Sequence, residues 1–241
     1  MCFETQHIRK ILSYMERGIY SHRRPVADIR MKPCGYGAYG LLREDSSGWE
    51  VYRPGNRWGG RDTHLWLRLH VRLDTADAGR AVICHLDSGR SGWDATNPQM
   101  MAFIDGHPAQ GLDVNHRQLL LTPCARGDEE FTVDLDAYGG TEDSPATLNA
   151  SLAALERDTE KLCYDIRVPL EVAEQLEEGD VRRIDILRYL NAAVDRLDLR
   201  QMHSPDYERS VQQALTYLET EFYGKYCHPG EVVETCVGHT H

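Results

Sequence analysis

The chain has 241 residues, enough for one large domain or two of ordinary size, and 41% of them are hydrophobic, enough for a substantial core. Its formal net charge of -11 argues against a nucleic-acid partner, because such partners bind basic surfaces. No apolar run approaches membrane-spanning length and the first residues lack a signal-peptide pattern, so we expect no membrane partner. Seven cysteines without a C-x-x-C pair fit reduced thiols, and we expect a cytoplasmic protein.

Residues 1–48 are predicted to form a helix followed by a loop. Residues 3–17 carry apolar side chains near one helical face, which is typical of an amphipathic helix. The loop contains a glycine-rich segment at residues 34–40. Its G-x-G-x-x-G pattern matches a dinucleotide fingerprint in letters only, because no strand is predicted before it and no helix after it.

Residues 49–145 are predicted to form an accessory domain of short antiparallel strands. The segment from Leu65 to Leu73 alternates apolar and polar side chains, as a half-buried strand does. Residues 100–109 are predicted to form a hairpin, because Asp105-Gly106 suits the positive φ values of a tight turn. Further strands are expected at residues 81–86, 117–121 and 130–135. This pattern favours a β-sandwich of the jelly-roll, galactose-binding-like kind.

Residues 146–229 are predicted to form a helical connecting region. Apolar residues recur at helical spacing in three segments, which are residues 159–177, residues 180–198 and the segment from Ser204-Pro205 to Gly224. Pro169 should kink or split the first of these helices, because proline lacks the backbone N–H that a helix interior needs.

Two short segments complete the sequence. Residues 151–155 fit either a last strand or the start of the first connecting helix. Residues 230–241 contain a strand-like run, which we expect to be the first strand of a truncated α/β catalytic domain. The chain is therefore predicted to be α+β, with an N-terminal helix, an antiparallel β-sandwich, a helical segment and that first strand.

Three loop segments are rich in aromatic, amide and carboxylate groups: residues 56–62, 92–99 and 111–117. Sugars bind to such groups, because their C–H faces lie on aromatic rings and their hydroxyls pair with polar side chains. The candidate substrate-binding residues are Trp58, Trp93, Asp94, Asn97, Asp113 and His116. The alternative, which we favour, is that both tryptophans fill an interface and that the polar groups fasten the loops. No catalytic residue is assigned.

The chain closes on His239-Thr240-His241, directly after the strand-like run. Histidines at the end of a strand are a common beginning of a metal site. A catalytic zinc needs three protein ligands and one open position, so two histidines do not suffice. We therefore expect the chain to be the front part of a longer enzyme.

Several strings resemble the N-terminal part of glycoside hydrolase family 38 α-mannosidases, of the cytosolic, vacuolar and bacterial type. They are Arg57–Gly60, Gly92–Gln99, Gln110–Arg117, Arg182–Leu187 and Phe222–Tyr226, and Gly238–His241 resembles the opening of that family's His-x-His-x-Asp motif. The resemblance extends over nearly the whole chain.

The resemblance implies a zinc-dependent retaining α-mannosidase that hydrolyses terminal α-linked mannose from oligosaccharides, with His241 as a zinc ligand. The expected partners are mannose-containing oligosaccharides, the missing catalytic domain, and further copies of the chain in a homo-oligomer. Because the motif's aspartate, the nucleophile and the general acid are absent, we expect the fragment to be inactive and to hold no tightly bound zinc. The alternative is a non-catalytic carbohydrate-binding or interaction module.

Overall fold

The computed structural model describes residues 3–90 and 99–227, and it divides the chain into two compact units. Unit 2 is residues 20–155 and unit 1 joins residues 1–19 to residues 156–241. Each unit is described by itself below.

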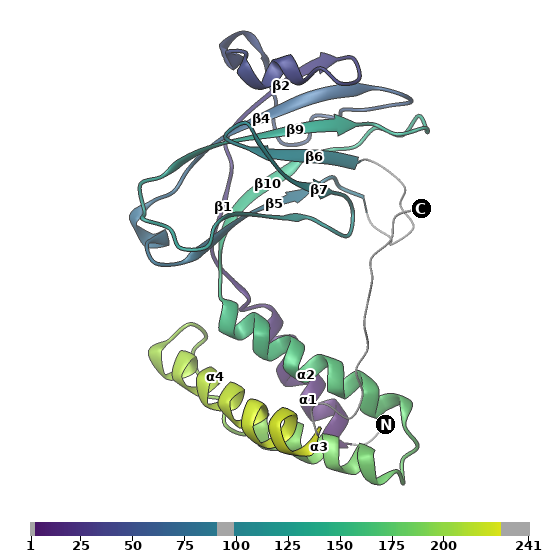
Figure 1. Cartoon of the computed structure of the whole chain (residues 1–241), viewed down its shortest axis with the longest axis vertical. Coiled ribbons are helices and arrows are strands. Elements are labelled where there is room, and N and C mark those ends of the chain that lie inside the picture. Colours follow the sequence, from purple (N-terminus) through teal and green to yellow (C-terminus); the bar gives the residue numbers. More distant parts are fainter. Residues whose placement is uncertain (1–2, 91–98, 228–241) are drawn as a thin grey trace. The chain divides into compact units, whose positions relative to one another are not determined.

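Unit 2 is a sandwich of two antiparallel sheets (Figure 1). The sheets have the strand orders β3-β2-β4-β9-β6-β7 and β1-β10-β5-β8. The strands are β1 Tyr20–Pro25, β2 Asp28–Cys34, β3 Glu50–Val51, β4 His64–Arg72, β5 Ala81–Asp87, β6 Gln99–Ile104, β7 His107–Leu112, β8 Gln118–Thr122, β9 Glu130–Tyr138 and β10 Asn149–Leu155. The fold predicted for this part of the chain is confirmed.

The core of the sandwich lies between the sheets and follows from the alternation in their strands. Leu65, Leu67 and Leu69 of β4 are buried, and they pack with Val82 and Leu86 of β5 from the other sheet. Alternate side chains of a strand point to opposite faces, so the polar residues of β4 lie on the outer face of the six-stranded sheet. The predicted hairpin between β6 and β7 is confirmed, since Asp105 has φ 50° and Gly106 has φ 80°.

The structure places the sandwich at residues 20–155, beyond the expected residues 49–145 at both ends. Residues 20–34, expected as a loop, form β1 and β2. β1 is an edge strand with no buried side chain, and β3 covers only two residues of β2. Strands with an open edge tolerate polar residues and proline, so their sequences lack a clear alternation. Residues 151–155 belong to β10, which pairs with β1 and β5.

Unit 1 is helical, and its elements are α1 Phe3–Glu16, α2 Arg157–Gln175, α3 Val181–Val194, α4 Pro205–Tyr217 and the π-helix η4 Leu218–Tyr226. α1 packs against α2, and Arg9 and Glu16 form ion pairs with Glu174 and Arg167 of α2. The helix expected at the start of the sequence therefore belongs with the helices that follow the sandwich. α4 begins as predicted, because the Ser204 side chain accepts a hydrogen bond from the Tyr207 amide at 3.2 Å.

Pro169 does not split α2, which continues from Arg157 to Gln175. A proline in a helix leaves the carbonyl four residues before it without its usual donor. Here that carbonyl belongs to Asp165, and the Tyr223 hydroxyl of η4 donates a hydrogen bond to it at 2.9 Å. The donor lost at the proline is thus replaced from another helix.

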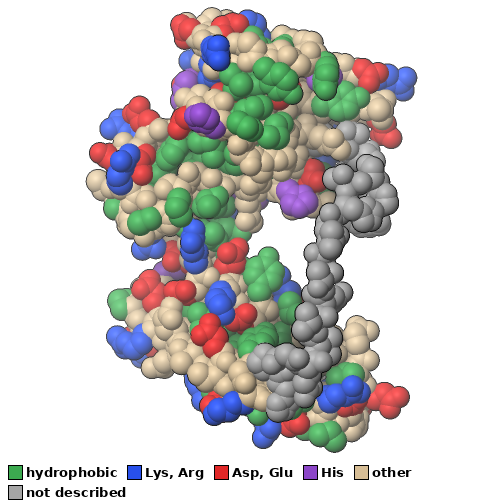
Figure 2. Space-filling model, viewed as in Figure 1, with side chains coloured by type: hydrophobic (Ala, Val, Ile, Leu, Met, Phe, Trp, Pro, Cys, Tyr) green, Lys and Arg blue, Asp and Glu red, His purple; other side chains and the backbone are tan. Residues whose placement is uncertain are grey.

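No helix within the described ranges is long and apolar enough to cross a membrane. Acidic and basic side chains are interspersed over the visible face of the molecule (Figure 2). Surface charge therefore does not single out a site there. The expected catalytic-domain strand at residues 230–241 lies outside the described residues.

Candidate functional site

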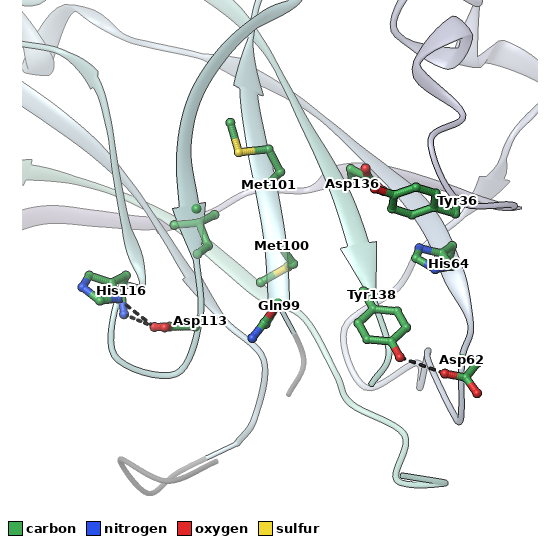
Figure 3. A pocket seen from close by; sticks show the side chains of 12 residues that line it. Tyr36, Asp62, His64, Gln99, Met100, Met101, Asp113, His116, Asp136 and Tyr138 are labelled. Atoms are coloured by element: carbon green, nitrogen blue, oxygen red, sulfur yellow. Dashed lines mark hydrogen bonds and ion pairs between the residues drawn. The ribbon is translucent and has the colours of Figure 1, made fainter. Parts of the chain in front are cut away.

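Four strands of the six-stranded sheet, β2, β4, β9 and β6, begin or end side by side at one end of the sheet. Across the sheet, Cys34 pairs with His64, His64 with Tyr138, and Tyr138 with Gln99. β7 ends nearby at Leu112. The strand ends and their loops enclose a pocket of about 670 Å³ (Figure 3), lined by Tyr36, Asp62, His64, Gln99, Met100, Met101, Gly111, Leu112, Asp113, His116, Asp136 and Tyr138.

The strand register decides which side chains reach this pocket. Asp136 and Tyr138 of β9 alternate with Leu135 and Ala137, which are fully buried in the core. Asp136 and Tyr138 therefore lie on the outer face of the sheet. Figure 3 shows the floor of the pocket at Met100 and Met101, with Asp113 and His116 on one side and the tyrosines, His64, Asp62 and Asp136 on the other.

One wall of the pocket is aromatic. The rings of His64 and Tyr138 are stacked, with centroids 4.9 Å apart and planes 27° apart. The ring of Tyr36 meets His64 edge-on at 5.6 Å, and Tyr36 is 86% exposed. An exposed ring beside polar groups offers a face on which an apolar ligand surface can lie.

A carboxylate is fixed at the foot of this wall. The Tyr138 hydroxyl donates to Asp62 Oδ1 at 2.8 Å, and that hydrogen bond raises the pKa of Tyr138. Asp62 has φ 53°, and its backbone N–H donates to the Gly140 carbonyl at 2.7 Å. The carboxylate keeps further lone pairs that can accept hydrogen bonds from a ligand.

The opposite wall is a tight turn around Asp113. Its Oδ1 accepts hydrogen bonds from the backbone amides of Asn115 and His116, both at 2.7 Å, and lies 3.0 Å from His116 Nδ1. Burial raises the pKa of the Asp113 carboxyl, but the hydrogen bonds from His116 and Asn115 outweigh burial, so the pKa lies below its usual value. The turn holds the imidazole of His116 at the pocket with a carboxylate beside it.

Asp136 lies on β9, on the same side of the pocket as the aromatic wall (Figure 3). Burial raises the pKa of its carboxyl, and the nearby His64 lowers it by less. No hydrogen bond or ion pair reaches this carboxylate from any residue of the described ranges. Its acceptor positions are therefore open to a ligand.

A crossing segment, residues 35–49, lies on the outer face of the sheet and carries Tyr36. Arg68 of β4 fixes it there by donating hydrogen bonds to the carbonyls of Leu41, Leu42 and Glu44, while its Nε donates to Asp134 Oδ1 at 2.7 Å. Trp49 at the end of the segment packs with Trp66 of β4 and Phe103 of β6, and these buried side chains form a small apolar cluster. The crossing segment thus has its own core, which positions the aromatic wall.

Among the sequence-predicted residues that the structure describes, Asp113 and His116 line the pocket. Trp58 is 4% exposed and lies in the sandwich core, where its backbone forms a bridge with Ala146. It therefore neither lines the pocket nor offers a surface to a partner. Trp93, Asp94, Asn97 and His241 lie outside the described residues.

Sequence analysis missed the aromatic wall and Asp136. Tyr36 stands in the glycine-rich segment that was considered only as a dinucleotide motif, and His64, Asp136 and Tyr138 fall just outside the strands predicted at residues 65–73 and 130–135. One signal was present: Asp134-x-Asp136-x-Tyr138 puts polar groups at every second position up to the end of a strand.

Within residues 3–90 and 99–227, no group of three or more His, Cys, Asp or Glu side chains could hold a metal ion. His239 and His241 lie outside these ranges. Zinc binding at His241 therefore stays a prediction.

Comparison with known proteins gives no family. No protein-family model matches the chain, and no curated protein is similar to it in sequence. Among solved structures, a β-glucuronidase from Bacteroides uniformis matches at 14% identity with a TM-score of 0.43, over 55% of this chain and 18% of that one. A β-glucuronidase from an uncultured Clostridium matches at 7% identity with a TM-score of 0.42, over 56% and 29%.

A glycosyl hydrolase family 2 member from Bacteroides cellulosilyticus also matches, at 12% identity with a TM-score of 0.38, over 55% of this chain and 20% of that one. The matched region thus spans less than a third of each of these proteins. At such low identity and TM-score, no activity carries over to this chain.

The predicted membership in the family 38 α-mannosidases is wrong. No family model supports it, and the similar solved structures include β-glucuronidases and family 2 members in place of family 38 mannosidases. Two of the strings behind the resemblance, Arg182–Leu187 and Phe222–Tyr226, lie in α3 and η4 of the helical unit. Trp58, the centre of one string, is a core residue of the sandwich.

Proposed function

We propose that the sandwich is a carbohydrate-binding domain that serves a glycosidase-type enzyme. It binds a short oligosaccharide in the pocket at the strand ends of its six-stranded sheet. The observation that carries this proposal is the exposed ring of Tyr36 beside carboxylates fixed on both sides of one hollow. A volume of about 670 Å³ lies within the range of roughly 300–1,000 Å³ that small-molecule sites occupy.

The groups of the pocket suit the two faces of a sugar. The C–H face of a pyranose ring lies on an aromatic plane such as Tyr36, which removes apolar surface from water. Sugar hydroxyls donate to the carboxylate of Asp136 and to the remaining acceptor positions of Asp62. Met101 lies on the floor of the pocket and adds apolar contact.

A glycan array probed with the whole chain tests this proposal, with Tyr36→Ala as the decisive variant. Loss of the ring should weaken binding roughly tenfold, because an aromatic contact contributes about 0.5–1.5 kcal/mol beyond its buried area. The matched control is Tyr164→Ala, since Tyr164 is 51% exposed but belongs to α2 in unit 1. Absence of binding to any glycan, or equal loss in both variants, contradicts the proposal.

A glycosidase active site is the second candidate, and the carboxyl groups favour it. Burial raises the pKa of Asp136, whereas at Asp113 hydrogen bonds overcome burial and lower it. Carboxyl groups with separated pKa values match the acid and base roles in glycoside hydrolysis. Hydrolysis of an aryl glycoside that disappears in Asp136→Asn supports this candidate, and binding without turnover supports the binding domain alone.

A further inference from the structure

The charge of the pocket is one-sided. Its lining residues include the carboxylates of Asp62, Asp113 and Asp136, but no lysine or arginine. A cationic ligand group is therefore attracted to this hollow and an anionic one is repelled.

Resting on the proposed function, we propose that the pocket selects sugars with a free amino group, such as glucosamine oligomers, and rejects uronic acids. The preference comes from Asp136, whose carboxylate has no donor among the described residues. Asp113 differs, because backbone amides and His116 already donate to it. Asp62 differs too, because the Tyr138 hydroxyl donates to it. An ammonium group supplies the three donors that an unpaired carboxylate can accept.

Arg117, which borders the turn around Asp113, does not offset this charge. Arg117 follows His116, but its guanidinium donates to the carbonyls of Val114 and Arg90 and to the Asp87 carboxylate. A uronate is usually held by an arginine that presents two parallel N–H groups. These three acceptors hold the guanidinium of Arg117, so Arg117 does not present two parallel N–H groups to the pocket.

Calorimetric titration at one pH with three oligosaccharide series of equal length tests the inference. The series are glucosamine oligomers, their N-acetylated counterparts and oligogalacturonates, with tetralysine as a probe for non-specific attraction to a chain of net charge -11. We expect the glucosamine series to bind at least tenfold more tightly than the acetylated series, and the uronates to give no measurable binding.

Asp136→Asn identifies the origin of the preference. It should reduce the ratio of the two affinities, glucosamine series over acetylated series, about tenfold, because both series lose the same hydroxyl contact but only the glucosamine series loses an ionic one. The matched control is Asp128→Asn, because Asp128 is an exposed acid of the sandwich outside the pocket. Tetralysine should bind wild type and Asp136→Asn equally.

The outcomes separate the two proposals. Binding of uronates as tight as that of neutral sugars overturns this inference and leaves the carbohydrate-binding proposal standing. A preference for glucosamine that persists in Asp136→Asn, or is lost equally in Asp128→Asn, also overturns it. Absence of binding to all three series overturns the proposed function itself.

Discussion

Replacing Arg68 by methionine should destabilise the sandwich strongly. Arg68 and Asp134 are 5% and 1% exposed, and their side chains meet at 2.7 Å. Methionine keeps much of the side-chain volume but leaves the Asp134 carboxylate buried and unpaired. Breaking a buried ion pair by removing one partner costs about 3–5 kcal/mol. The carbonyls of the crossing segment that Arg68 serves lie nearer to solvent and can bind water instead.

Urea unfolding followed by tryptophan fluorescence measures this loss in the whole chain. All four tryptophans of the chain fall between residues 20 and 155, so their fluorescence reports the sandwich and not the helical unit. With a slope of about 2 kcal/mol per molar urea, a loss of 3–5 kcal/mol lowers the midpoint by about 2 M. The variant should also recover stability as the pH falls from 7 to 5, because protonation removes the buried charge of Asp134.

The matched control is Arg72→Met. Arg72 lies on the same strand and the same face as Arg68 and also faces a carboxylate of β9, at 3.7 Å from Glu130, but its side chain is 77% exposed. An exposed pair contributes little, so the midpoint should not move measurably. Equal effects of the two substitutions, or a loss below about 1 kcal/mol for Arg68→Met, would refute the role assigned to the buried pair.

Two further predictions concern the helical unit and the turn at the pocket. Tyr223→Phe should cost about 1 kcal/mol in the wild type but little in a Pro169→Ala background, where the Asp165 carbonyl regains a helical donor. Helical circular dichroism during unfolding measures this cycle, and equal costs in both backgrounds would contradict it. Because the folded pKa of Asp113 is lowered, its stabilisation is present above the unfolded pKa of about 3.8 and is lost as the pH falls through the folded pKa. Asp113→Asn should therefore make stability less dependent on pH below about 4, and an unchanged acid profile would contradict the assignment.

The sequence predicted those elements whose pattern of apolar, polar and turn residues is complete within one segment. The alternation in β4 and the Asp105-Gly106 turn are visible in single segments, and both were confirmed. β1 and β2 were missed because an open edge places no strict demand on alternate residues. Pro169 was expected to kink or split its helix, and the replacement donor is Tyr223, which is distant in sequence.

The site depends on pairings that a sequence does not show. Asp113 and His116 were found because they stand in one polar turn, where local composition is informative. His64 and Tyr138 stack only because β4 and β9 pair in a particular register, and each alone looks like an ordinary strand residue. Trp58 was misinterpreted from local composition, because it stands in a glycine-rich segment but its side chain is buried in the sandwich core.

Methyl NMR of the methionines tests the central claim most directly, because it locates the ligand as well as detecting it. The chain has six methionines, and Met100 and Met101 line the pocket while Met15 is fully buried in α1 of the helical unit. On titration with the tightest glycan of the array, the Met101 methyl signal should shift saturably and the Met15 signal should not move. Saturable binding that leaves the methyl signals of Met100 and Met101 unchanged and shifts that of Met15 would contradict a carbohydrate site at the strand ends of the six-stranded sheet.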